Sequence, residues 1–176
     1  MKSIIDHFLI SWLRTGRYSW SKIRRRLFER GYLNKPLPAV TSLEDIESRL
    51  SQVKWTMDGP LHLFDSISYP ELTWTKKKDD CDGFATLAAA LLNQLNKEFS
   101  PVLVTVMVRP IRLSHTICAF KAPVQGLWFF DNGSLRRVDC GNYADIAGII
   151  SQSAKRLVCW DVRNPDTFDK IEFHTA

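Results

Sequence analysis

The stretch DDCDGFATLAAALL, residues 79–92, places one cysteine between a polar loop and an apolar run that is typical of a helix. Cys81 therefore lies in the first turn of the predicted helix, where backbone N–H groups are free and carry partial positive charge. This position favours the thiolate, which is the nucleophilic form of cysteine. The same N–H groups could stabilise an oxyanion that develops on a substrate carbonyl. Cys81 is for these reasons a candidate nucleophile.

A base and an orienting group follow Cys81 in the chain. His115 begins the predicted strand HTICAF, and Asp131 ends the predicted strand LWFFD. If these two strands pair around the APVQG connection, the two side chains come side by side on adjacent strands. The set then provides Cys81 as nucleophile, His115 as general base and Asp131 as the residue that orients the imidazole.

The immediate neighbours of Cys81 have roles of their own. We interpret Asp80 and Asp82 mainly as carboxylates that cap the helix N-terminus, although their charge opposes a thiolate at Cys81. Asp82 and Gly83 are also candidates for contact with substrate or oxyanion, because Gly83 permits close approach of another backbone or of substrate. Cys118 is expected on the opposite strand face from His115, in the core.

The elements that must position these residues change character at Pro101. Before Pro101 the sequence has several helical patterns, and the last of them is the helix that begins near Cys81. After Pro101, β-branched and apolar runs indicate strands. Gly16 is expected to break or kink the first helix, and Gly31 to end the second. The predicted helices cover 4–13, 21–30, 42–53, a short segment after Pro70, 84–95 and 144–154, with an irregular stretch at 54–78. The predicted strands cover 102–111, 115–122, 126–133, 135–140 and 156–162. Helices followed by a mostly antiparallel sheet make an α+β fold.

Positive charge is concentrated near the N-terminus. The chain of 176 residues has a net charge of +5 and a pI of about 9.1, and residues 14–30 contain seven basic side chains against Glu29 alone. Such a segment favours an anionic partner, which could be nucleic acid, anionic lipid or an acidic protein face, although a solvated helix face is commoner. The apolar residues of 21–30 share one helix face, which either packs on the protein itself, the commoner case, or lies on a membrane surface. We predict a basic amphipathic helical extension over 1–38 and a catalytic domain over 39–176.

Composition and cysteine spacing exclude several classes. Apolar residues make up 45% and charged residues 24%, as in soluble globular proteins. The four cysteines form no C-x-x-C pair, so we expect neither a zinc site nor a redox motif. IIDHFLISWL is too short to span a bilayer and lacks a signal-peptide cleavage site. We therefore expect a cytoplasmic protein with free thiols.

Taken together, DDCDGFATLAAALL, SHTICAF and WFFDNG resemble the core of the transglutaminase-like cysteine protease superfamily, over roughly residues 42–140. The resemblance implies a papain-like α+β fold, in which a buried helix carrying the cysteine packs on a mostly antiparallel sheet. It also implies acyl-transfer chemistry, usually hydrolysis of a peptide or amide, with no metal or cofactor and with Cys81, His115 and Asp131 as the triad. Asp79 departs from the glycine that is frequent in the family. The family's upstream Trp or Gln oxyanion donor has no sure counterpart, Trp74 and Trp55 being the nearest candidates.

Two functions of different class follow from the sequence. The first is a cysteine hydrolase that acts on a peptide or protein substrate. The sequence does not distinguish hydrolysis from acyl transfer or deamidation by the same triad. The second is a module with weak or lost turnover that binds a protein, nucleic acid or membrane partner through residues 1–38. In a third arrangement, residues 1–38 cover the active-site cleft.

Overall fold

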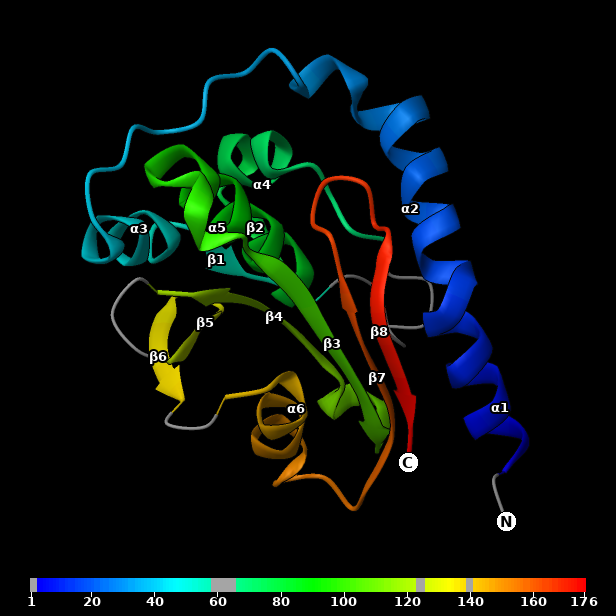
Figure 1. Ribbon diagram of the computed structural model, residues 1–176. Coiled ribbons are helices and arrows are strands. Elements are labelled where there is room, and N and C mark those ends of the chain that lie inside the picture. The colour runs from blue at the N-terminus through cyan, green and yellow to red at the C-terminus, as the bar shows by residue number, and fades with distance from the viewer. Residues whose placement is uncertain (1–2, 58–65, 123–125, 139–140) are drawn as a thin grey trace.

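The computed structural model describes residues 3–57, 66–122, 126–138 and 141–176. At its centre lies a six-stranded antiparallel sheet with the strand order β6-β5-β4-β3-β7-β8 (Figure 1). The strands are β3 (Val102–Arg109), β4 (His115–Lys121), β5 (Leu127–Asp131), β6 (Ser134–Val138), β7 (Arg156–Arg163) and β8 (Lys170–Thr175). The consecutive strands β3 to β6 pair as neighbours, so short connections bring His115 and Asp131 onto adjacent strands.

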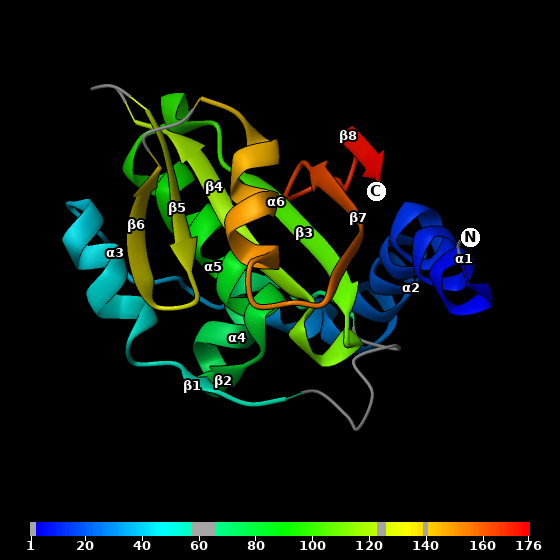
Figure 2. The ribbon, with the colours of Figure 1, turned by 90° about the horizontal axis from the view of Figure 1, so that it is seen from below.

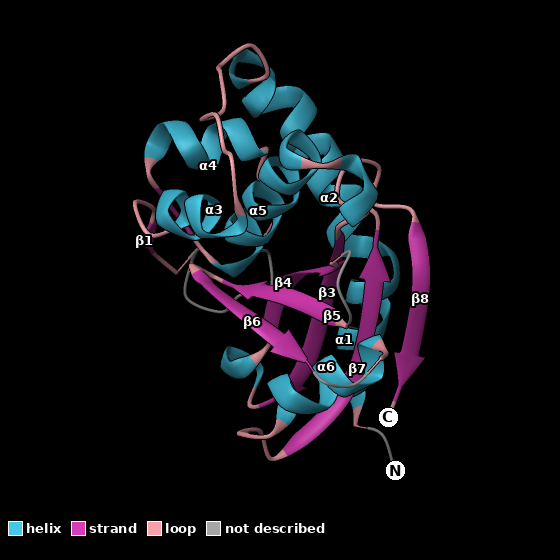
Figure 3. Cartoon of the chain, turned by 60° about the vertical axis from the view of Figure 1, so that its left-hand side comes forward, coloured by secondary structure: helices cyan, strands magenta, loops and turns pink. Residues whose placement is uncertain are grey.

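Helices cover both faces of this sheet (Figures 2 and 3). The long helix α5 (Cys81–Leu95) packs on one face, with α3 (Leu43–Leu50) and α4 (Pro70–Lys76) against it, while α6 (Tyr143–Ser151) packs on the other face. Smaller elements are β1 (Lys54–Trp55), which pairs in parallel with β2 (Lys78–Asp79), and the 3₁₀ turns η4 (Lys97–Phe99) and η5 (Ile111–Leu113). This arrangement confirms the expected α+β class, with a buried helix carrying Cys81 on a mostly antiparallel sheet.

The central strand β3 is apolar on both faces because each face has its own core. Leu103 and Met107 belong to the cluster that includes the buried side chains of α5, whereas Val104 and Val106 belong to the cluster that includes Ile146 of α6. Strands covered on both faces have continuous apolar runs instead of alternation. The run VLVTVMV is therefore explained by two helical layers.

The predicted elements are confirmed from α3 to β7, with ends that differ by a few residues. The sequence analysis did not predict β8, whose sequence KIEFHT places single apolar residues among polar ones at the sheet edge. The two-residue strands β1 and β2 are too short to leave a pattern. The part of the predicted irregular stretch at 58–65 lies outside the described residues.

The N-terminal helix continues through Gly16, so the expected break is wrong. Residues 4–32 form one helical rod, in which two π-helical segments alternate with α-helix and a 3₁₀ turn ends it. Its parts are α1 (Ile4–Ser11), η1 (Trp12–Gly16), α2 (Arg17–Arg24), η2 (Arg25–Glu29) and η3 (Arg30–Tyr32). Gly16 has helical dihedrals, and a Cβ there would lie 2.6 Å from the Trp12 ring. The glycine thus makes room for Trp12 within the helix instead of ending it.

From Arg17 onward the side of this rod that faces the protein is mainly polar, which corrects the expected packing of the apolar face of residues 21–30. Leu13, Arg17, Ser21, Arg25 and Glu29 are buried at every fourth position, and the wide π turns keep this four-residue spacing in register. Ile23, Leu27 and Phe28 point to solvent. The physical reason is the surface under α2 and η2, which offers a carboxylate, hydroxyls and backbone carbonyls as partners for the buried polar side chains.

Several anchors hold the rod in this orientation. The Ser21 hydroxyl accepts a hydrogen bond from the Ile67 N–H at 3.0 Å, and Arg25 Nε donates to the Ile67 carbonyl at 2.9 Å. Glu29 accepts from the Tyr69 N–H at 2.9 Å. Leu9, Leu13 and Tyr18 also join the core cluster on the α5 side of the sheet. The domain boundary at residue 38 stays a prediction. In the described part of the chain, no helix is long and apolar enough to cross a membrane.

Candidate active site

Cys81 is the first residue of α5, as the motif predicted. Asp80 caps the helix: its carboxylate accepts a hydrogen bond from the Asp82 N–H at 3.2 Å. The capping interpretation of Asp80 is therefore confirmed. The Cys81 side chain lies at a helix N-terminus in a nearly closed environment, with 8% of the residue exposed. Such a site combines the positive end of a helix with little competing water.

The register of the sheet brings His115 and Asp131 together. Cys118 pairs with Phe130 across β4 and β5, and the same register continued by one residue places Asp131 opposite Ile117. His115 is then the diagonal neighbour of Asp131 on the same face, within reach of its side chain. The His115 Nε2 atom lies 2.8 Å from Asp131 Oδ1. The tight turn after β5, with Asn132 at a φ of 51°, keeps Asp131 at the end of its strand.

Electrostatics at this pair favour a charged imidazole. Burial lowers the pKa of His115, but hydrogen bonds to Asp131 and to the Cys81 side chain, with the charges of both groups, outweigh burial and raise it to about 10. The hydrogen bond from His115 holds the pKa of Asp131 below its ordinary value against the effect of burial, and Arg136 at 3.4 Å acts in the same direction. These interactions stabilise the imidazolium form of His115 beside an ionised Asp131.

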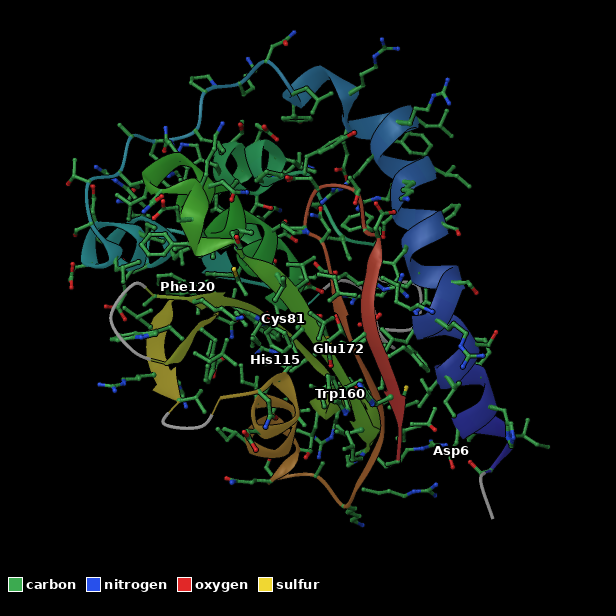
Figure 4. The ribbon with its side chains drawn as sticks, viewed as in Figure 1. Asp6, Cys81, His115, Phe120, Trp160 and Glu172 are labelled. Carbon is green, nitrogen blue, oxygen red and sulfur yellow. The ribbon has the colours of Figure 1, made fainter. Side chains whose placement is uncertain are left out.

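Cys81 and His115 line one small cavity, and both lie near the middle of the molecule in Figure 4. The cavity volume is about 20 Å³, which is room for about one water molecule. The described residues around it are Leu9, Trp12, Arg17, Cys81, Thr105, Met107, Ile111, Ser114, His115 and Thr116. Three of these come from the N-terminal rod. The rod therefore forms part of the wall of the cavity beside Cys81.

Arg17 is a residue of this site that the sequence analysis treated only as part of a basic run. Its NH2 group lies 2.7 Å from Asp82 Oδ2, and its NH1 group donates to the hydroxyls of Thr105 and Thr116 at 3.2 Å. Both side chains of the ion pair are almost fully buried. Asp82 is thus paired with Arg17, which offsets its negative charge next to Cys81. Nothing in the local sequence signals this pairing, because Arg17 is far from Asp82 in the chain.

Gly83 is required by a neighbouring side chain. A Cβ at this position would lie 2.1 Å from Asp79 Cγ. Asp79 accepts hydrogen bonds from the Thr73 hydroxyl at 2.5 Å and from the Asp80 N–H at 3.0 Å, so it ties α4 to the start of α5. The close approach at Gly83 is made by the Asp79 side chain and not by another backbone, as one form of the prediction had it. Trp74, Asp82 and Gly83 are not among the described residues that line the cavity, and their role in substrate or oxyanion contact stays a prediction.

The carboxylates of Asp79, Asp80 and Asp82 lie within 4.8 Å of one another, close enough to share a cation. Each also has partners within the protein: Thr73, the Asp82 N–H and Arg17. The protein's own donors thus account for a structural role of this group at the helix start.

The other described cysteines lie in the core. Cys118 and Cys159 are fully buried, and burial raises the pKa of the Cys118 thiol. Cys118 faces the α5 side with Leu103, as expected. Cys140 lies outside the described residues. Among the described cysteines, Cys81 is the one that lines a cavity together with a histidine.

Comparisons with known proteins add little to this site. No family model matches the chain, and no curated protein does. Among solved structures, the chain is similar to LapG of Legionella pneumophila, in a structure described as EGTA-treated. The TM-score is 0.47 with 14% sequence identity, over 90% of this chain and 79% of LapG. Similarity at this level carries no information about activity.

Proposed function

We propose that this protein is a cysteine-dependent acyl-transfer enzyme, most simply a peptidase or amidase, with Cys81, His115 and Asp131 as its catalytic residues. The observation that carries the proposal is one imidazole with two partners: His115 Nε2 lies 2.8 Å from Asp131, and His115 also interacts with the Cys81 thiol. Nucleophilic catalysis by cysteine needs a thiol, a base that contacts the thiol, and a group that orients the base. Cys81, His115 and Asp131 make these contacts in that order.

The chemistry follows from these contacts. The Cys81 sulfur attacks the substrate carbonyl, and backbone N–H groups in the first turn of α5 stabilise the oxyanion. The His115 imidazolium, held by Asp131, gives its proton to the leaving amine, and a thioester remains on Cys81. Water, deprotonated by His115, then cleaves the thioester and regenerates the thiolate. If an amine takes the place of water, the same steps transfer the acyl group.

The test separates ionisation of Cys81 from access to it. Iodoacetamide labelling of each cysteine is followed by peptide mass spectrometry between pH 5 and 9 in the wild type, His115→Ala, Trp12→Ala and the double variant. Trp12→Ala should increase the labelling of Cys81 at every pH, because it removes a cavity wall. His115→Ala should remove the labelling at low pH, well below the usual cysteine value of about 8.5, in both backgrounds. Buried Cys118 and Cys159 serve as references in the same molecule.

Equal low-pH labelling of Cys81 with and without His115, in the Trp12→Ala background, would contradict the proposal. If labelling behaves as expected, hydrolysis of a mixed peptide library provides the next readout. Cys81→Ala should abolish that hydrolysis, while Cys159→Ala should retain it.

A second candidate is a transglutaminase-like module of low turnover that binds a protein, nucleic acid or membrane partner through its N-terminal helices. The size of the cavity favours it, because about 20 Å³ admits no peptide. The two candidates differ in one result. The enzyme hydrolyses peptides once the wall is opened by Trp12→Ala, whereas the module has a reactive thiol without turnover.

A further inference from the structure

The outer face of the N-terminal rod combines exposed apolar and basic side chains. We use the name "outer face" for the exposed residues Trp20, Ile23, Leu27 and Phe28 together with Lys22, Arg26 and Arg30. Leu27 is 67% exposed and Phe28 is 72% exposed. Apolar side chains of this size, clustered on one helix and left in water, mark an interaction site.

The exposed charged side chains of this rod are all basic. The two acidic residues of 3–33, Asp6 and Glu29, are both buried and ion-paired. Asp6 contacts Arg109 at 3.2 Å and Arg156 at 3.1 Å, and Glu29 contacts Arg24 at 3.0 Å. The exposed cations of the outer face therefore have no acidic neighbour on the rod that would weaken their attraction for an anion.

A basic groove lies alongside the outer face. It has a volume of about 550 Å³ and is lined by Lys22, Arg25, Arg26, Arg30, Leu33, Tyr69, Asp166, Thr167 and Phe168. Four cations line it against one carboxylate, that of Asp166. Arg25 is held in place by the Ile67 and Ser68 carbonyls and by the rings of Tyr69 and Phe168, so the floor of the groove is fixed. Lys22, Arg26 and Arg30 belong to both surfaces, so the groove borders the apolar side chains directly.

We propose that the outer face binds the surface of a bilayer that contains anionic phospholipids. Ile23, Leu27 and Phe28 enter the boundary between headgroups and acyl chains, while phosphate groups take the basic groove. A helix with an apolar face flanked by Lys and Arg binds membranes in this way, lying in the plane of the interface. The rod lies along one edge of the molecule, beside β8, so a flat surface can reach it (Figure 1).

The composition of the face favours lipid over nucleic acid. Proteins bind nucleic acid through phosphate contacts and through aromatic or Arg side chains that stack on bases. Ile23 and Leu27 would stay in water in such a complex, whereas a bilayer removes them from it. The proposal does not depend on the chemistry of Cys81, and its failure would leave the proposed function untouched.

The full-length protein is tested by flotation with phosphatidylcholine vesicles and with vesicles that contain about one third phosphatidylglycerol. Binding is expected only to the anionic vesicles and should weaken as salt is raised. Each cation should contribute roughly fivefold to the affinity for anionic vesicles. The triple variant Lys22→Gln/Arg26→Gln/Arg30→Gln should therefore bind about 100-fold more weakly. Leu27→Ser/Phe28→Ser should also lower it, by about tenfold for each side chain.

Matched controls lie elsewhere on the surface. Ile149→Ser removes an apolar side chain that is 37% exposed on α6, and Lys97→Gln/Lys121→Gln/Lys155→Gln removes three exposed charges. Both controls should bind as the wild type does. Free inorganic phosphate at millimolar concentration should compete weakly, since it lacks the apolar part of the ligand.

Other outcomes would overturn the proposal. These are equal binding to neutral and anionic vesicles, equal losses in the control variants, or full competition by free phosphate. Tight binding to duplex DNA that is insensitive to Leu27→Ser/Phe28→Ser would assign the face to nucleic acid. A stable dimer that Leu27→Ser/Phe28→Ser dissociates would assign it to a second copy of the chain.

Discussion

Helix α5 and the segment α2–η2 bury opposite kinds of side chain. On α5 the buried residues are mainly apolar, among them Leu87, Leu91 and Leu92, and the helix packs on the apolar face of β3 and β4. On α2–η2 Tyr18 is buried, but the other buried residues are polar: Arg17, Ser21, Arg25 and Glu29. The apolar side chains of Ile23, Leu27 and Phe28 face solvent. The difference teaches that amphipathic pattern alone does not decide which side of a helix turns inward. The chemistry of the opposing surface decides it.

The opposing surface differs because the rod crosses the polar start of α5. Asp82, Thr105 and Thr116 meet Arg17 there, and the carbonyls of Ile67 and Ser68 meet Arg25. Burying a charge with full partners is tolerated, while burying it without them is costly. Each anchor therefore opposes rotation of the rod about its axis.

The largest effect is expected from Arg17→Met, which removes the main polar anchor of the rod. It leaves the Asp82 carboxylate buried beside Cys81 without its ion-pair partner, at a cost of about 3–5 kcal/mol in the free energy of unfolding. Urea unfolding measures this cost. Arg26→Met, on the exposed side of the same rod, should change it by less than about 0.5 kcal/mol. Similar losses in both variants would show that the buried pair does not set the orientation.

The second prediction compares two leucines directly. Leu87→Ala in α5 leaves a cavity in the core and should cost about 2–5 kcal/mol. Leu27→Ala in η2 removes the same atoms from a side chain already in water and should cost less than about 0.5 kcal/mol. Thermal unfolding followed by circular dichroism provides both values. A large cost at Leu27 would mean that the apolar face packs inward in solution.

Polar and apolar packing meet at the start of α5, around Gly83. Gly83→Ala forces a methyl group into the Asp79 side chain and should destabilise the protein by roughly 1–3 kcal/mol. The matched control is Gly148→Ala in α6, which has nothing within 4 Å and should stabilise by roughly 0.5–1 kcal/mol. The two variants should therefore shift the unfolding midpoint in opposite directions. A shift of the same sign in both would contradict the close approach of Asp79.

The contacts of His115 also predict how stability depends on pH. The pKa of His115 is raised to about 10, so the stability that its proton contributes is full below about 6.5 and is lost as the pH rises to about 10. Asp131 has a lowered pKa, so its contribution is present above about 3.9 and is lost as the pH falls. In Asp131→Asn the His115 titration, followed by NMR of the imidazole, should move to lower pH. An unchanged midpoint would mean that Asp131 does not hold the imidazolium.

Much of the site was predictable because its signals are local. A cysteine opening an alanine-rich helix, a histidine beginning a strand and an aspartate before Asn-Gly each depend on a few adjacent residues. The hairpin connection between β4 and β5 then fixes their register. Arg17 and Trp12 were not predictable as parts of the site, because their contacts with it join distant parts of the chain.

The order of elements from α3 to β7, the α+β class, and Cys81 at a helix start with His115 and Asp131 on adjacent strands were predictable from the sequence. These follow from short-range periodicity and turn chemistry, which act within a few residues. Three other features arise from contacts between distant parts of the folded chain. The rod lines the cavity beside Cys81, Arg17 pairs with Asp82, and Ile23, Leu27 and Phe28 face solvent. A helix turns inward the side that its partner surface can satisfy, and that surface exists only once the chain has folded.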